Sequence, residues 1–394
     1  MGKKLNGTFT PPTLDRIFIE KSCAEETEAR EVVDRFRVFY PATLFEVVER
    51  EPWFERVPGP LSAGEFERSK KNLLIKKYPG QFFKRCPGAS QKNTITCCNY
   101  YVLNLGQQCN FNCSYCYLQS YLNAPTLQVY ANINRAASEL RQAALAQPDL
   151  PYRVGTGETI DSLSLDPITL YSRKLIEVFS EFPRWSLEFK TKSDLVDQFL
   201  DCEHAGNVVV SWSINPQIVI DHEEFGTASL AARLRAAEKC RQRGFPVAFH
   251  MDPLIWFPGW ESHYQDLVKN ITRRFGPEDL SVISIGSLRF QPSQRHLMRE
   301  RFGMKESWVT SAEMFPSEGG KFRYDASLRR EMLRFVLQEF KSRSGKYKVF
   351  FCMETPETWL ASYEKFPMKE ENLRPFFRPL PSPEGPLGQN EDPP

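Results

Sequence analysis

Residues 106–119 read GQQCNFNCSYCYLQ, and the spacing of their three cysteines decides the fold class. Cys109, Cys113 and Cys116 follow the pattern C-x3-C-x2-C. Thiolates are typical ligands of iron–sulfur clusters, and three of them on one short loop can bind three irons of a [4Fe-4S] cluster. The fourth iron is then left without a protein ligand and is open to a small molecule.

S-adenosylmethionine (SAM) is the small molecule that this pattern indicates. In radical SAM enzymes its amine and carboxylate chelate the open iron, and an electron from the cluster splits SAM to give a 5′-deoxyadenosyl radical. The alternative is a zinc loop. Structural zinc usually takes four Cys or His ligands at paired short spacings, and no His lies near this loop. The pattern therefore favours a radical SAM enzyme with a [4Fe-4S] cluster and SAM as cofactors.

The composition is that of an ordinary globular protein. The chain has 394 residues, of which 41% are hydrophobic, so it can form a main core with appendages. It contains no apolar run long enough to span a membrane, and its first residues, MGKKLN, lack the apolar core of a signal peptide. Ten cysteines together with an iron–sulfur loop point to a reducing compartment. A cytoplasmic location without a membrane partner is expected.

Basic residues gather in two segments, although the net charge is only +2. Residues 289–348 hold roughly twice as many basic as acidic side chains. Such segments are typical of proteins that bind a polyanion, which makes DNA a candidate partner. The alternative is a solvated face that is balanced by acids elsewhere. The other segment has no acid and contains Arg68, Lys70, Lys71, Lys76, Lys77, Lys84 and Arg85.

From residue 99 onward, short apolar runs alternate with amphipathic helices. This alternation predicts βα units around a parallel sheet, in the form of a partial (β/α) TIM-type barrel of the radical SAM kind. Such barrels carry their catalytic residues at the carboxyl ends of the strands, and the cysteine loop follows the first strand. The expected strands are 100–105, 129–133, 152–156, 186–190, 208–213, 247–252, 282–288 and 347–352. The expected helices are 168–182, 229–243, 263–275 and 328–342.

Four regions are expected along the chain. Residues 1–14 form a disordered N-terminus. Residues 15–98 form an N-terminal α/β extension with the basic segment and extra cysteines. Residues 99–365 form the partial barrel, and the proline-rich residues 366–394 form a disordered tail.

Polar residues follow three of the expected strands and could build a cofactor site. Glycine lets the backbone approach a ligand, Glu158 could bind the SAM amine, and Lys192 could pair with the SAM carboxylate. A single polar residue at a strand end is more often structural, but repeated placement on one rim favours a shared site. The candidates are Thr156, Gly157, Glu158, Lys192, Ser213 and Asn215.

Several motifs resemble the spore photoproduct lyase family, which consists of radical SAM enzymes of DNA repair. The most specific are SYCYLQ at 114–119 and SWSIN at 211–215. The resemblance spans roughly residues 15–365. Further matching segments are RSKKNL at 68–73, GTAS at 226–229, PLI at 253–255, LRF at 288–290 and GKFRY at 320–324.

The resemblance implies a reaction and roles for particular residues. The family cleaves a thymine dimer, spore photoproduct, by abstracting a hydrogen atom and later returning one. Tyr115 and Tyr117 match tyrosines that relay the radical back to SAM, although they could instead simply pack beside the cluster. Lys192 and Ser213 match SAM-contacting positions. The resemblance also implies a reductase or flavodoxin-type electron donor and a monomer.

One departure from the family concerns its hydrogen donor. The family uses a cysteine in the loop after the strand that ends near Thr156, but here residues 157–161 read GETID, with Glu158 or Thr159 at that position. An O–H bond is much stronger than a thiol S–H bond, so neither residue can give a hydrogen atom to a carbon radical. Either another thiol takes over or the reaction differs. Cys352, at the end of the last expected strand, could face the barrel mouth or be a buried structural cysteine.

A second departure is the presence of Cys86, Cys97 and Cys98 ahead of the cluster strand. With a fourth ligand they could hold a second cluster or a zinc ion. One of them could instead be the missing hydrogen donor, or all three could be ordinary buried cysteines.

The sequence therefore predicts a radical SAM lyase that acts on a nucleobase or DNA, with Tyr115, Tyr117 and Glu158 as catalytic candidates. A radical SAM enzyme for a small molecule, nucleotide or peptide is the main alternative. A third possibility is a non-enzymatic iron–sulfur or zinc protein that kept only the fold.

Overall fold

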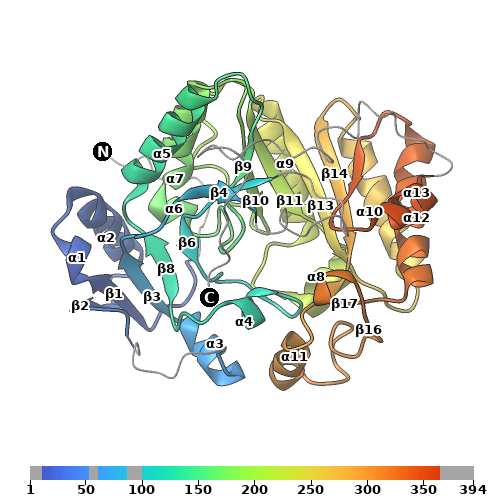
Figure 1. The fold of residues 1–394 in the computed structure, drawn as a ribbon, viewed down its shortest axis with the longest axis horizontal. Helices are drawn as coiled ribbons and strands as arrows, with labels where there is room; N and C mark the ends of the chain where they lie inside the picture. The colour runs from blue at the N-terminus through green and yellow to red at the C-terminus, as the bar shows by residue number, and fades with distance from the viewer. Residues whose placement is uncertain (1–10, 53–60, 87–99, 364–394) are drawn as a thin grey trace.

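The computed structural model describes residues 11–52, 61–86 and 100–363, and Figure 1 shows its sheets with the helices around them. The larger sheet has the strand order β18-β14-β13-β11-β10-β9-β5-β4, with all neighbours parallel except β4 and β5. The two end strands of this order are not paired with each other in the described part of the chain, so the sheet is an open barrel. This confirms the predicted fold class. The strands are β4 (Phe83–Arg85), β5 (Tyr101–Leu103), β9 (Arg153–Gly155), β10 (Ser186–Thr191), β11 (Val208–Ser213), β13 (Val247–Leu254), β14 (Leu280–Ser287) and β18 (Val349–Phe351).

Helices carry the chain from one strand of this sheet to the next. They are amphipathic, and their apolar faces are buried, as in βα units. Because the strands are parallel, their carboxyl ends meet at one edge, where the polar residues expected at strand ends lie together. The connecting helices are α5 (Ile133–Ala146), α7 (Tyr171–Ser180), α9 (Leu230–Gln242), α10 (Trp260–Arg274) and α12 (Ala326–Arg343).

A second sheet has the order β2-β1-β3-β8-β6. The expectation of a barrel strand at 129–133 was wrong. The strand is β8 (Leu127–Tyr130), it pairs with β3, and α5 begins at Ile133. The apolar pattern predicts a buried strand but does not specify the sheet that receives it. The other elements here are β1 (Arg16–Glu20), β2 (Leu44–Val48), β3 (Asn72–Lys76), β6 (Gly106–Gln107), α1 (Lys21–Ala24), α2 (Thr27–Phe39) and α3 (Ala63–Ser69).

Short elements complete the described chain. Two of them, β7 and β12, form a small ribbon that matters for the site, and β15, β16 and β17 form another small sheet. Among the described helices, none is long and apolar enough to cross a membrane. The short elements are β7 (Asn112–Cys113), β12 (Glu224–Phe225), β15 (Arg289–Phe290), β16 (Phe315–Pro316), β17 (Phe322–Arg323), α4 (Leu118–Tyr121), α6 (Asp166–Thr169), α8 (Gln217–Glu223), α11 (Gln294–Phe302), α13 (Pro356–Ser362) and a 3-10 turn, Glu318–Gly320.

Asn207 joins the barrel sheet to the helix outside it. Its buried amide nitrogen lies 2.8 Å from Phe179 O, 3.1 Å from Phe182 O and 2.7 Å from Trp185 O. These carbonyls belong to the end of α7 and to the turn that leads into β10. The amide thus supplies donors to backbone groups that a terminating helix leaves unpaired.

We expect Asn207→Ala to lower the free energy of unfolding by about 2 kcal/mol, because buried carbonyls lose their donor. Asn207→Asp should cost more, since a carboxylate would face three carbonyl oxygens. Urea unfolding of the apoprotein measures both. Gln242→Ala, at an exposed position of α9, is the control and should change stability by less than about 0.5 kcal/mol. Equal stability of wild type and Asn207→Asp would contradict this role.

Candidate active site

The cysteine loop leaves the carboxyl end of β5 and is paired to the rest of the protein on two sides. β6 is antiparallel to β8, and β7 is antiparallel to β12, with Cys113 opposite Glu224. Cys113 is buried, whereas Cys109 and Cys116 are half-buried. The loop has little regular structure, so its shape depends on side chains from elsewhere.

Lys70 is one of these side chains. It is 9% exposed at the end of α3, and its Nζ donates to Cys109 O at 2.6 Å and to Phe111 O at 2.5 Å. The sequence placed Lys70 in a segment for polyanion binding, but its ammonium lies beneath the cysteine loop. The sequence shows that the segment is basic, but it does not show which of its lysines points into the protein.

Arg301 supports the loop from α11. Its guanidinium is 1% exposed, forms an ion pair with Glu67 at 2.6 Å, and donates to the side-chain oxygens of Asn112 and Gln119. Gln119 in turn donates to Ser114 O at 2.8 Å and to Cys116 O at 3.0 Å. The loop is therefore fixed by contacts that reach nearly 200 residues along the chain, which local sequence patterns do not show.

The donor chemistry of the loop fits an iron–sulfur cluster. Burial raises the pKa of the Cys109 thiol to about 12 and raises that of Cys113 as well, with Lys70 and Lys192 opposing this. Metal binding to such thiols must release their protons. In the described part of the chain no three His, Cys, Asp or Glu side chains converge on a single-ion site. Three thiols on one short loop are nevertheless the donor set of a [4Fe-4S] cluster with one open iron.

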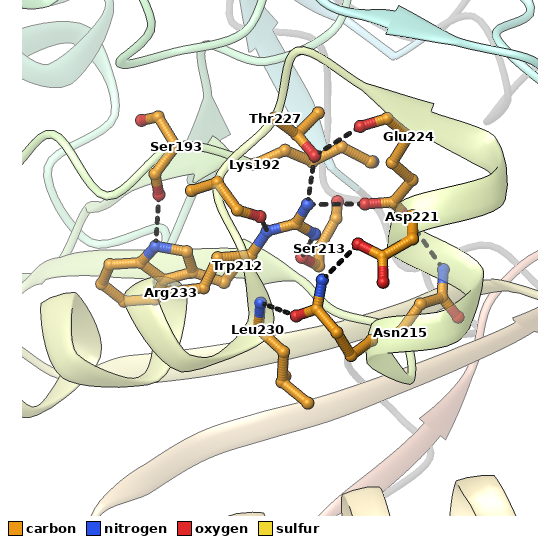
Figure 2. Close-up of polar contacts among 12 residues, drawn as sticks. Lys192, Ser193, Trp212, Ser213, Asn215, Asp221, Glu224, Thr227, Leu230 and Arg233 are labelled. Atoms are coloured by element: carbon orange, nitrogen blue, oxygen red, sulfur yellow. Dashed lines mark hydrogen bonds and ion pairs between the residues drawn. The ribbon is translucent and has the colours of Figure 1, made fainter.

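A buried network ties the loop to the end of β11. Figure 2 shows Arg233 at its centre, in an ion pair with Glu224 at 2.7 Å and donating to Ser213 O at 2.8 Å and Thr227 Oγ1 at 2.6 Å. Both ion-pair partners are 0% exposed. Sequence analysis missed Arg233 and Glu224, because an acidic residue after a helix and an arginine within one carry no local signal of pairing.

Tyr115 belongs to the same network. Its hydroxyl donates to Glu224 Oε1 at 2.5 Å, and Asn215 Nδ2 donates to the same oxygen at 3.0 Å. Burial and the Glu224 carboxylate hold the pKa of Tyr115 well above its ordinary value. Asn215 also accepts a hydrogen bond from Tyr264 at 3.0 Å. Asn215, expected to contact SAM, therefore already has protein partners at both ends of its amide and acts here as a support.

Lys192 and Ser213 lie on the same side of the loop as Tyr115. Lys192 Nζ is 5.5 Å from the centre of the Tyr115 ring. Burial works against its charge, but Glu224 and Cys113 outweigh burial and raise the pKa of Lys192. No hydrogen-bond acceptor for this ammonium is found among the described residues, so it can receive an anionic ligand group such as the SAM carboxylate.

The loop after β9 brings Glu158 to the other tyrosine. The Tyr117 hydroxyl donates to the backbone oxygen of Glu158. Burial raises the pKa of the Glu158 carboxyl, with Lys84 opposing it, and its buried Oε2 has no hydrogen-bond partner. Thr159, the other residue at the family's donor position, lies 2.6 Å from Asn104 Oδ1 and 2.7 Å from Gly106 O and is structural. Glu158 is therefore the residue of this loop with a free acceptor.

Asp161 joins the loop after β9 to the backbone at Lys192. Its carboxylate accepts from Ser164 N at 2.9 Å, Thr191 Oγ1 at 2.7 Å and Lys192 N at 2.8 Å. A Cβ at Gly157 would lie 3.1 Å from Lys190 O, which shows how closely the loop approaches β10. Thr156 binds Ser162 Oγ at 2.8 Å and is thus internal to the loop.

Charged side chains also fill the barrel beneath these loops. Glu188 and His250 are buried and 2.6 Å apart. Burial and the nearby Lys190 lower the pKa of His250, with Glu188 opposing them. Asp252 and Arg289 form a two-contact ion pair at 2.8 Å and 3.0 Å.

Cys352 lies beside that ion pair, directly after β18. Its backbone nitrogen donates to Ile285 O at 2.7 Å, and its Sγ is 3.8 Å from Arg289 Nη2. Burial works against the charge of Asp252, but Arg289 outweighs burial and holds the pKa of this carboxyl at about 2. Cys352 is half-buried and sits at the strand end, as the sequence suggested it could.

The proposed second metal site has no support from the described residues. Cys86 is half-buried after β4, and Cys97 and Cys98 lie outside the described residues.

The basic segments are only partly available to a polyanion. Arg323, from the basic segment 289–348, is 0% exposed and lies 3.5 Å from Glu354, so it is not available to a polyanion. Arg68 and Lys71 are exposed and remain available to a polyanion.

A comparison with protein families supports the resemblance seen in the sequence. The family model for spore photoproduct lyase matches residues 88–320, more than half of the chain. A spore photoproduct lyase of a Geobacillus species is 28% identical over 250 residues, covering 62% of this chain and 70% of that protein. The Bacillus subtilis enzyme is 29% identical over 266 residues, covering 67% and 74%.

Solved structures of spore photoproduct lyase share the fold. A doubly substituted variant with bound AdoMet and dinucleoside spore photoproduct gives a TM-score of 0.74 at 22% identity, covering 86% of this chain and 98% of the other. A complex with dinucleoside spore photoproduct gives 0.73 at 22% identity, covering 86% and 99%. At this identity the likeness shows the architecture alone.

The Asp252–Arg289 pair should make stability sensitive to acid. The folded-state pKa of Asp252 is about 2, below its ordinary value of 3.8, so the pair stabilises the protein above pH 3.8 and this contribution is lost as pH falls toward 2. The shift corresponds to roughly 2 kcal/mol. We expect Asp252→Asn to be less stable than wild type at pH 7, and the difference to shrink between pH 4 and pH 2.

Urea unfolding of the apoproteins across this pH range tests that expectation. Asp279→Asn is the matched control, because Asp279 pairs with Arg241 at 3.1 Å at a more exposed site. An exposed pair contributes only about 0–1 kcal/mol. A difference between wild type and Asp252→Asn that does not change with pH would contradict the assignment.

Proposed function

Since this chain belongs to the spore photoproduct lyase family of radical SAM enzymes, we propose that it cleaves SAM reductively and uses the resulting radical on a thymine dimer in DNA. The observation that carries the proposal is the placement of three thiols, Lys192 and Tyr115 around one side of the cysteine loop. Relatives have been solved with AdoMet and with dinucleoside spore photoproduct, which supports the same ligands here.

Cys109, Cys113 and Cys116 would hold the [4Fe-4S] cluster, whose role when bound is to supply the electron that splits SAM. Lys192 would pair with the SAM carboxylate, because its ammonium is half-buried and has no acceptor among the described residues. Glu158 Oε2 would accept from the SAM amine, since this buried oxygen has an unfilled acceptor site. Ser213 lies at the end of β11 and can contact the ribose or carboxylate.

The two tyrosines are placed for the relay role that the resemblance implies. Tyr115 contacts Glu224, which can take the hydroxyl proton when the ring is oxidised and return it afterwards. Tyr117 lies at the Glu158 loop, next to the position at which the family carries its hydrogen donor. The two tyrosines thus contact different parts of the site, Tyr115 the Glu224 network and Tyr117 the Glu158 loop.

A thiol other than the family's must return hydrogen to the product radical, and we assign this step to Cys352. The thiol transfers its hydrogen atom to the thymine carbon radical, which breaks the S–H bond, forms a C–H bond and leaves a thiyl radical. A tyrosine then gives its hydroxyl hydrogen atom to the thiyl sulfur, which restores the thiol and leaves a tyrosyl radical, and that radical takes a hydrogen atom from 5′-deoxyadenosine. Cys352 lies directly after β18, beside the Asp252–Arg289 pair and 3.8 Å from Arg289 Nη2, which places its thiol at a strand end.

The remaining partners follow from the family and the composition. Exposed Arg68 and Lys71 would contact phosphates, and binding should weaken as salt rises. A thymine dimer would have to leave the base stack to reach the radical. A flavodoxin-type reductant, a monomeric state and a cytoplasmic location stay predictions.

The cluster and SAM cleavage can be tested directly. After anaerobic reconstitution with iron and sulfide, wild type should bind about four irons per chain, and Cys113→Ala should bind far fewer. The reduced wild-type protein should form 5′-deoxyadenosine from SAM, as measured by chromatography. Cys202→Ala, a half-buried cysteine far from the loop in sequence, is the control. Zinc in place of iron, or no deoxyadenosine, would contradict the proposal.

The role of Cys352 as hydrogen donor can be tested by substitution. With dinucleoside spore photoproduct as substrate, Cys352→Ala should still form deoxyadenosine, but its yield of repaired thymine should fall at least about tenfold, a barrier change of roughly 1.4 kcal/mol. Cys202→Ala should repair as wild type does.

Full repair by Cys352→Ala would rule out Cys352 as donor and direct the same test to Cys86, Cys97 and Cys98. Deoxyadenosine without repair by wild type would favour the alternative of a different substrate, such as a small molecule or peptide.

A further inference from the structure

Lys70 is a buried cation without an anionic partner in the described protein. Its neighbours Arg68 and Lys71 are exposed, whereas Lys70 turns inward and is 9% exposed. No carboxylate of the described residues lies within ion-pair distance of its Nζ. Burying an ammonium costs several kcal/mol unless an opposite charge compensates it.

The groups around this ammonium indicate where the compensating charge lies. Its two acceptors are backbone oxygens of the cysteine loop, Cys109 O and Phe111 O. The remaining contact is the Phe66 ring, whose centre is 4.9 Å away. Arg301 lies over the same ring, 4.5 Å from its centre, but it is paired with Glu67. The cysteine loop is therefore the part of the site that faces the Lys70 ammonium.

We propose that Lys70 is the counter-cation of the iron–sulfur cluster and makes the cluster easier to reduce. The inference rests on the proposed function, because it requires the cluster on Cys109, Cys113 and Cys116. Reduction adds one negative charge to the cluster, so a fixed cation beside it stabilises the reduced form more than the oxidised form. Net charge near a cluster and hydrogen bonds around it are among the factors that set its potential.

Lys70 thus acts through the cluster and is a positioning residue. Lys192 contacts a different part of the loop, since its Nζ lies 5.5 Å from the centre of the Tyr115 ring. The two lysines therefore have different proposed roles. Lys192 would bind SAM, whereas Lys70 is enclosed by the loop and would act on the cluster.

The alternative is that Lys70 serves only as a clamp that holds two loop carbonyls. Lys70→Gln separates the two roles, because glutamine keeps an N–H donor but carries no charge. Lys70→Arg keeps both the charge and the donors, and Lys70→Met removes both. Lys71→Gln removes the adjacent, exposed charge and is the matched control.

The test is a redox titration of the reconstituted proteins, followed by electron paramagnetic resonance of the reduced cluster, with iron counted on the same samples. At the potential that half-reduces wild type, the ratio of reduced to oxidised cluster should fall at least about tenfold in Lys70→Gln and Lys70→Met, a shift of about 59 mV to more negative potential. Lys70→Arg and Lys71→Gln should stay near wild type.

A wild-type potential in iron-loaded Lys70→Gln would overturn the counter-cation role. If neither neutral variant takes up iron, the stability of the apoproteins toward urea distinguishes the two roles. Removing an uncompensated buried cation should leave Lys70→Met apoprotein at least as resistant to urea as wild type, whereas loss of a clamp should make it less resistant and would overturn the inference. A wild-type protein that binds no iron would instead refute the proposed function.

Discussion

The buried ion pair between Arg233 and Glu224 is the interaction on which the arrangement of the site depends. Glu224 lies opposite Cys113 in the β7–β12 ribbon, and Arg233 lies in α9, outside the barrel sheet. The same guanidinium binds the end of β11 through Ser213 O, so one side chain joins the cysteine loop to the strand that ends in the SWSIN motif. Removing one partner would leave the other charge buried and unpaired, at a cost of about 3–5 kcal/mol. The pair therefore fixes the position of Tyr115 relative to the loop, because Tyr115 shares the Glu224 carboxylate.

The distribution of cations shows why charge counting alone gives an incomplete account of a binding surface. Lys70, Arg301 and Arg323 belong to basic segments, yet each is nearly or fully buried and serves the interior. Lys76 and Lys77 lie near the acids Glu20 and Glu26, respectively. The positive charge that is left for a polyanion is therefore smaller than the sequence suggests. Part of the basic composition instead pairs with carboxylates of the protein itself, as Arg301 does with Glu67 and Arg323 with Glu354.

The sequence predicts the parts of this protein that are encoded locally. Strand–helix alternation gives the parallel sheet, and polar residues after the strands lie together because parallel strands end at a common edge. Partners from distant segments could not be predicted. Glu224 and Lys70 are recognisable only once the loop has folded against them, and the strand at 127–130 has the same apolar pattern in either sheet. Asn215 shows the same limit, since its placement was predicted but its bonds to Glu224 and Tyr264 were not.

Replacement of the donor cysteine by Glu158 alters the site locally. Thr159 and Asp161 on either side still tie the loop to Gly106 and Lys192, so the backbone is held whatever side chain position 158 carries. In the proposed function, the steps that generate the first radical would depend on the cysteine loop and on Lys192, and they would not require a thiol at 158. The step that returns hydrogen has a different requirement. A thiol need only reach the substrate carbon, and it can do so from the end of any strand. Cys352 ends β18, the strand farthest from β5 along this side of the open sheet, and so can approach a substrate from the opposite edge. The open barrel thus allows the donor to move to another strand while the radical-generating site stays the same.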